Sequence, residues 1–257
     1  MSHIHIPDGV LPLWLIGLGW LATAIMLYLG IRSLRRADRV RVVPHIGVMA
    51  ALVVAAMSME IVPIAYHVNL TVLAGIILGP AASMVAAFVV NLVLALFGHG
   101  GVTVIGLNTV VIGAEMVGGA LIFRAVSRAL PARPGLSAGL ATVLTLFLST
   151  TLMIGIVGLS RVNPANARDL GALSPRTLSF SNPLKGGLFA NRIVTPEQEA
   201  AHHKAPLSLA RFAVAVYILG AIGWTIESLL VGYMVAFIAR VRPGLLRSPL
   251  LARMGWT

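Results

Sequence analysis

The feature that most constrains this chain is a series of long apolar segments separated by short segments rich in arginine. A helix needs about 20 apolar residues to cross the hydrocarbon core of a bilayer. Apolar residues make up 58% of the 257 residues and charged residues only 11%, whereas a soluble chain carries about 25% charged residues. We therefore expect an all-α, polytopic membrane helix bundle in the cell inner (plasma) membrane, surrounded by the lipid bilayer.

The apolar segments predict about seven hydrophobic helices. They cover residues 10–31, 46–65, 70–78, 81–97, 102–123, 136–159 and 207–238. The third and fourth are separated at Gly79-Pro80, because proline lacks an amide proton and glycine permits a sharp turn. The third is short for a complete span, so we expect it to begin inside the protein. Residues 1–257 are predicted to form a single integral membrane domain.

The distribution of charge predicts the orientation of the bundle. Twelve of the 19 Lys and Arg residues lie in the short segments 32–45, 124–135 and 239–257, whose one acidic residue is Asp38. Because Lys and Arg in short loops favour the cytoplasmic side, we expect the N-terminus outside and the C-terminus cytoplasmic. Residues 161–206 then form an extracytoplasmic loop. The formal charge of +11 is explained by topology, so no nucleic-acid partner is predicted.

Several kinds of chemistry are disfavoured by the sequence. The chain has no cysteine, which excludes disulfides and thiolate metal sites. It contains neither a G-x-x-x-x-G-K-[ST] nor an H-E-x-x-H motif, so neither ATP hydrolysis nor a zincin is predicted. The segment Gly135–Gly139 matches G-x-S-x-G but opens a membrane helix, whereas the nucleophile elbow needs a strand-to-helix turn. We predict that the chain is not an enzyme.

Histidines occur at the predicted outer ends of several segments. They are His3, His5, His67 and His99. Imidazole is a common protein ligand for Ni, Co, Cu and Zn. In Met1-Ser2-His3, the terminal amine, deprotonated backbone amides and the imidazole can surround one ion in a square plane, which favours Ni(II) or Cu(II). If Met1 is removed, Ser2 supplies the amine. The alternative is that each histidine is an interfacial or capping residue.

Acidic residues inside apolar segments are a second candidate for function. Glu60, Glu115 and Glu227 lie in such segments, and a charge inside a membrane is costly enough to suggest a function. The alternative is a buried carboxylate held by an Arg or a polar group for structural reasons. Asp8, in the turn Pro7-Asp8-Gly9, is expected to order the N-terminal loop through an Asx-type hydrogen bond.

Four parts of the chain resemble one known family of membrane proteins. They are His5-Ile6-Pro7-Asp8-Gly9, His67 with Gly75–Pro80, Phe97–Asn108, and Glu227–Phe237 with Arg240-Val241-Arg242-Pro243. This combination resembles the CbiM/NikM family, the metal-binding S components of nickel and cobalt energy-coupling factor (ECF-type ABC) transporters. The resemblance does not cover residues 161–206.

The resemblance implies a metal site at the outer face. In the family the N-terminal segment, residues 1–9 here, enters the bundle. The metal is bound by the terminal amine, by the second residue and by a loop histidine. The second residue corresponds here to His5, and the loop histidine corresponds to His67. His99, Asn108 and Asp8 are expected nearby, where hydrogen bonds orient the ligands. Family chains begin Met-His, whereas His3 lies between the terminus and His5 here. Either His3 takes the amine-linked role, or His5 binds through its side chain with His3 as an added ligand. A different start residue or further trimming of the N-terminus would also restore the family pattern.

The resemblance also implies partners and a substrate. It implies import of Co²⁺ or Ni²⁺ as the transported substrate, with no catalytic cofactor. A transmembrane coupling (T) subunit, ATPase subunits and, in some cases, a small accessory membrane protein would complete the transporter. Two other functions stay open at this point: an intramembrane zinc-dependent enzyme, and a stand-alone metal permease or sensor.

Overall fold

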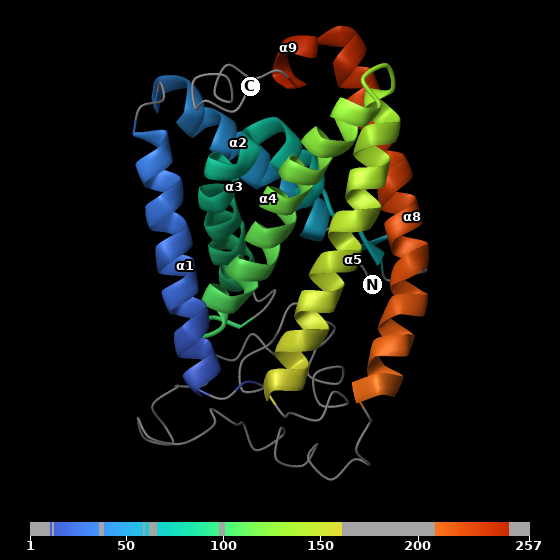
Figure 1. The fold of residues 1–257 in the computed structure, drawn as a ribbon. Coiled ribbons are helices and arrows are strands. Elements are labelled where there is room, and N and C mark those ends of the chain that lie inside the picture. The colour runs from blue at the N-terminus through green and yellow to red at the C-terminus, as the bar shows by residue number, and fades with distance from the viewer. Residues whose placement is uncertain are drawn as a thin grey trace.

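A computed structural model describes residues 11, 13–35, 39–58, 60–61, 66–97, 101–160 and 209–246 (Figure 1). The elements in these ranges are α1 (Leu13–Leu34), α2 (Arg39–Ser58), β1 (Glu60–Ile61), β2 (Tyr66–His67), α3 (Thr71–Leu96), α4 (Ile105–Ala129), α5 (Pro134–Ser160), α8 (Leu209–Val241) and α9 (Pro243–Leu246). Long helices dominate, so the predicted all-α bundle is confirmed.

The helices are arranged with α1 at one side, α5 and α8 side by side at the other, and α3 and α4 between them (Figure 1). Among the described residues, five helices are long and apolar enough to cross a membrane: α1, α3, α4, α5 and α8. The helix α2 contributes a shorter apolar stretch, Val42–Ser58. The chain is therefore a multi-pass membrane protein, as its apolar segments predict.

The predicted break at Gly79-Pro80 is confirmed. Gly79 has φ 74° and ψ 170° within α3, so the helix consists of two parts joined at a kink. Glycine adopts a positive φ without steric cost, and the following proline cannot continue the amide ladder. The hydroxyl of Ser83 donates to the Gly79 carbonyl oxygen at 2.7 Å. Within the described ranges, counting the two parts of α3 separately gives seven hydrophobic helices, the number predicted, with α9 as an additional single turn.

The bounds predicted for the second helix are wrong. We expected residues 46–65, but α2 begins at Arg39, passes through Pro44 and ends at Ser58. Pro44 lies near the start of the helix, where a proline interrupts few backbone hydrogen bonds. Because α2 starts early, it also ends early, and a two-stranded antiparallel ladder follows. In this ladder Glu60 pairs with His67 and Ile61 with Tyr66, so Glu60 lies outside the helix.

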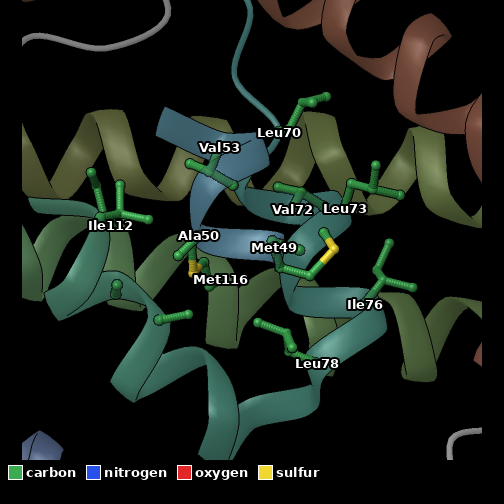
Figure 2. Close-up of a cluster of buried hydrophobic side chains, with 14 of the residues drawn as sticks. Met49, Ala50, Val53, Leu70, Val72, Leu73, Ile76, Leu78, Ile112 and Met116 are labelled. Atoms are coloured by element: carbon green, nitrogen blue, oxygen red, sulfur yellow. The ribbon is translucent and has the colours of Figure 1, made fainter. Parts of the chain in front are cut away.

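The main apolar core joins α2, α3 and α4 (Figure 2). Its labelled side chains are Met49, Ala50, Val53, Leu70, Val72, Leu73, Ile76, Leu78, Ile112 and Met116. A smaller buried cluster joins the start of α1 to the start of α4 and to α5. Side chains of α4 belong to both clusters, so the helix is packed along most of its length. A helix held in this way can position the site described next.

Candidate metal site

The predicted metal ligands are described only in part. Met1, Ser2, His3, His5, Asp8 and His99 lie outside the described residues. The backbone of His67 lies in β2, and Asn108 is buried in the first turn of α4 with 5% exposure. Among the described residues, no three His, Cys, Asp or Glu side chains form a group that could hold a metal ion. The ligand set therefore stays a prediction.

The chain that follows the N-terminal segment is fixed against the start of α4. Leu11 is 2% exposed and belongs to a buried cluster with Leu15, Val104 and Leu107. Leu11 comes six residues after His5, and Val104 comes five residues after His99. The described residues that follow these two histidines in the sequence, Leu11 and Val104, thus pack in the same cluster.

Direct backbone contact holds α1 against this part of α4. A Cβ added to Gly19 would lie 2.9 Å from the amide nitrogen of Leu107, and one added to Gly106 would lie 2.7 Å from that of Trp20. The indole Nε1 of Trp20 donates to the Thr103 carbonyl oxygen at 2.9 Å, and the Thr23 hydroxyl donates to that of Gly106 at 2.6 Å. Small residues permit such close approach of membrane helices.

A buried polar network lies at the start of α3, close in sequence to His67. The carboxylate oxygen Oε2 of Glu115 accepts from Asn69 Nδ2 at 3.1 Å and from Thr71 Oγ1 at 2.8 Å. Its second oxygen, Oε1, accepts from the Ser149 hydroxyl at 2.5 Å. The Thr71 backbone amide donates to Asn69 Oδ1 at 2.9 Å. The network thereby joins α3, α4 and α5 around one carboxylate, which is 1% exposed.

Two buried polar side chains of the candidate site, those of Asn108 and Glu115, lie on α4. Asn108 and Glu115 are seven residues apart on this helix, so both face the same side, about 10 Å apart along its axis. Both are buried. Asn108 follows Leu107, which packs in one cluster with Leu11, and Glu115 bonds to Asn69. One face of α4 therefore carries both buried polar side chains.

Among the described residues, three neutral polar side chains donate hydrogen bonds to the Glu115 carboxylate. Sequence reasoning singled out Glu115 but missed Asn69, Thr71 and Ser149. Thr71 and Ser149 are polar residues within predicted apolar segments, and Asn69 directly precedes one, which is the signal that could have found them. Glu227 is also buried, at 1% exposure on α8.

These features define a multi-pass membrane protein in which α4 bonds to a buried polar network and packs against Leu11, which follows the candidate metal-binding segment 1–9 in the sequence. A model of the CbiM family, described as a cobalt uptake substrate-specific transmembrane region, matches residues 5–245. The chain belongs to this family.

Relatives and solved structures agree with this assignment. The chain is similar to the cobalt transport protein CbiM of Geobacter sulfurreducens, with 33% identity over 223 residues, which are 82% of this chain and 63% of that protein. The chain therefore spans less than two thirds of this relative's length. Crystal structures of a transition metal transporter and of a truncated transition metal transporter share its fold. The TM-scores are 0.65 and 0.63, at 19% and 18% identity, covering 97% and 92% of this chain and 99% and 98% of those chains.

Proposed function

We propose that this chain is the substrate-binding membrane component of an ECF-type transporter that imports Co²⁺ or Ni²⁺. The observation that carries the proposal is the arrangement around α4: segments adjoining His5, His99 and His67 are anchored to one helix, with Asn108 and Glu115 on a common face. Family membership and a relative named as a cobalt transport protein support the same function.

The proposed ligands are His3, His5 and His67, together with nitrogen atoms of Met1 or Ser2. Nitrogen ligation suits both nickel and cobalt, and geometry selects between them. Asp8, His99 and Asn108 are proposed to orient these ligands through hydrogen bonds, as groups around a metal site commonly do. The metal is the transported substrate, so no catalytic chemistry is assigned to it.

The experiment is a binding measurement on protein purified in detergent and offered Ni²⁺, Co²⁺ and Zn²⁺ separately. His3→Ala, His5→Ala and His67→Ala are compared with His45→Ala, a matched control because His45 lies in α2. Mass spectrometry identifies the true N-terminus first. We expect one tightly bound Ni²⁺ or Co²⁺ that is lost in His67→Ala and kept in His45→Ala. Zinc preferred over both ions and unaffected by all three changes would contradict the proposal.

We also propose that the chain acts with a T subunit and ATPase subunits, with the N-terminus outside and the C-terminus cytoplasmic. The chain lacks the G-x-x-x-x-G-K-[ST] motif that binds nucleotide phosphates. Because it has no cysteine, the single variants Ser181→Cys, in the predicted extracytoplasmic loop 161–206, and Gly244→Cys can be labelled without background. In intact cells a membrane-impermeant maleimide should label the first and not the second. Metal uptake should also depend on co-expressed ATPase subunits, and ATPase-independent uptake would favour a stand-alone permease.

A further inference from the structure

We propose that Glu115 is a positioning residue for metal binding: its carboxylate fixes the chain that follows His67, and thereby fixes the placement of that histidine. The proposal rests on the proposed function, because it takes His67 as a metal ligand. It goes further by assigning a role to a carboxylate and three partners that lie outside the proposed ligand set.

The first step is the short chain distance between the network and the histidine. Asn69 follows His67 by two residues, and Thr71 follows it by four. Two residues of chain span at most about 7 Å. Because the connecting chain is so short, a shift of Asn69 also shifts the backbone of His67.

The second step is that both side chains of this turn bind to the same oxygen atom. Glu115 Oε2 accepts from Asn69 Nδ2 and from Thr71 Oγ1, while Asn69 Oδ1 accepts from the Thr71 amide. These three bonds close a ring that fixes the turn at the start of α3. Asn69, Thr71 and Glu115 are 2%, 0% and 1% exposed, so water does not compete with these bonds.

The third step is that the carboxylate is itself held in place. Ser149 on α5 donates to the other oxygen, Oε1, at 2.5 Å. An ionised carboxylate only accepts hydrogen bonds, and this one accepts from donors on two sides. A polar network whose members are satisfied rigidifies the site around it. The carboxylate thus holds the turn that follows His67 in a fixed position relative to α4 and α5.

The chemistry of the network provides a sharp set of variants. In Glu115→Gln the side-chain carbonyl can still accept from Asn69 and Thr71, while its amide donates to the Ser149 hydroxyl, so the ring is retained. Glu115→Ala removes the ring. Thr71→Val removes one bond and keeps the side-chain shape. Thr142→Val is the matched control, because the Thr142 hydroxyl is buried and bonds only within α5, to the Ala138 carbonyl oxygen at 2.9 Å.

The experiment measures Ni²⁺ and Co²⁺ dissociation constants of the full chain in detergent, with the melting temperature of the metal-free protein for each variant. Loss of a group that orients a ligand commonly weakens metal binding about 10- to 100-fold. We expect about a ten-fold or greater loss in Glu115→Ala and Thr71→Val, and less than about three-fold in Glu115→Gln and Thr142→Val. Thr71→Val should lower the melting temperature more than Thr142→Val, because its bond joins α3 to the carboxylate on α4. Positioning is separated from general stability if Thr71→Val is still fully folded at the temperature of the binding measurement and its affinity is nevertheless lower. If Glu115→Ala does not fold, Thr71→Val carries the test.

A double-variant cycle determines whether the effect passes through the histidine. If it does, Glu115→Ala causes no further loss of the residual affinity that is measured at high metal concentration in a His67→Ala background, since interacting residues give non-additive effects. The visible absorption of bound Co²⁺ should also change in Glu115→Ala at saturating metal. Wild-type affinity in both Glu115→Ala and Thr71→Val, or an equal loss in either background, would overturn the proposal.

Failure of this proposal differs from failure of the proposed function. If His67→Ala binds metal weakly and Glu115→Ala binds it with wild-type affinity, the positioning role alone is overturned. A His67→Ala variant that binds metal like the wild type would overturn both the ligand assignment and the positioning role.

Discussion

The helix pairs α3–α4 and α5–α8 belong to the same bundle but differ in what holds them together. In the most apolar windows of α3 and α4, 67% of residues are buried, compared with 44% for α5 and 28% for α8. The first pair lies inside the protein, whereas large apolar side chains such as Ile218, Leu229 and Tyr233 of α8 are exposed. In a membrane such an exposed apolar surface faces lipid or another chain.

The contacts of the two pairs differ accordingly. Between α3 and α4 the backbones touch, because a Cβ at Gly75 would collide with the Met116 carbonyl and one at Gly119 would lie 2.9 Å from Val72 Cγ1. Between α5 and α8 the backbones approach at one end, at Gly135 and Gly232. Further along, aromatic rings separate the helices: Phe147 stacks on Tyr217 with ring centroids 5.4 Å apart. The interior pair therefore tolerates less change than the peripheral pair, and four substitutions test this difference.

The largest effect is expected for Gly75→Ala. Its new methyl group would overlap the Met116 carbonyl group, and a backbone atom cannot rotate away as a side chain can. Overpacking a core costs about 1–3 kcal/mol and occasionally more, and we expect this change at the upper end. Thermal unfolding in detergent and the yield of monodisperse protein measure the loss. Gly155→Ala is the control, since nothing lies within 4 Å of its added methyl group. Equal stability of the two variants would contradict the close packing of α3 on α4.

Much of this interior arrangement could be predicted from the sequence. The apolar segments predicted the helices, because a bilayer requires long apolar runs, and Gly79-Pro80 predicted the kink in α3. The same reasoning failed at α2: the apolar run predicted a helix start at residue 46, but the helix begins at Arg39 and contains Pro44. A proline close to a helix start interrupts little, so its position alone does not determine where the helix begins.

The candidate site was predicted less completely. The sequence indicated that the carboxylate of Glu115 lies in an apolar environment, and this is confirmed. Its donors come from residues 69, 71 and 149 on other segments, and only tertiary packing brings them together. Asn108 was expected near the metal on the basis of the family resemblance. The structure places it in the first turn of α4, and its proposed role in orienting the ligands stays a prediction.

A smaller effect is expected for Gly135→Ala at the peripheral pair. The added methyl group would lie 2.7 Å from the Gly232 carbonyl oxygen and 2.8 Å from Ala236 Cβ. Gly135 is the second residue of α5, so the helix end can shift outward and relieve part of the overlap. We expect a loss of about 1–2 kcal/mol in thermal unfolding. The control is Gly118→Ala, which would make an ordinary contact of 3.7 Å with Thr145. A loss larger than that of Gly75→Ala would reverse the proposed order of the two pairs.

A smaller loss of stability is expected when one hydrogen bond between α1 and α4 is removed. In Thr23→Val the side-chain shape is kept, but the 2.6 Å bond to the Gly106 carbonyl oxygen is lost. Hydrogen bonds between membrane helices contribute about 0.6 kcal/mol on average and up to about 1.7 kcal/mol. We expect about 1 kcal/mol, because Thr23 is buried. Thr225→Val removes a bond within α8, to Ala221, and provides the comparison; an equal loss there would mean that the bond to Gly106 adds nothing to helix association.

The smallest effect is expected for Tyr217→Phe at the aromatic end of the α5–α8 contact. The change removes the 2.8 Å hydrogen bond between the Tyr217 and Thr151 hydroxyl groups, which is exposed, and keeps the ring stacked on Phe147. The Thr151 hydroxyl keeps its bond to the Phe147 carbonyl oxygen, and a hydrogen bond between membrane helices contributes about 0.6 kcal/mol on average, so we expect about 0.5 kcal/mol. Tyr217→Ala also removes the ring contacts with Phe147 and Trp224, which adds about 1 kcal/mol. If both variants unfold at the same temperature, the pair of hydroxyl groups, and not the aromatic rings, joins α5 to α8. The two helix pairs would then differ because hydrogen bonding holds α5 to α8, while close packing at glycines holds α3 to α4.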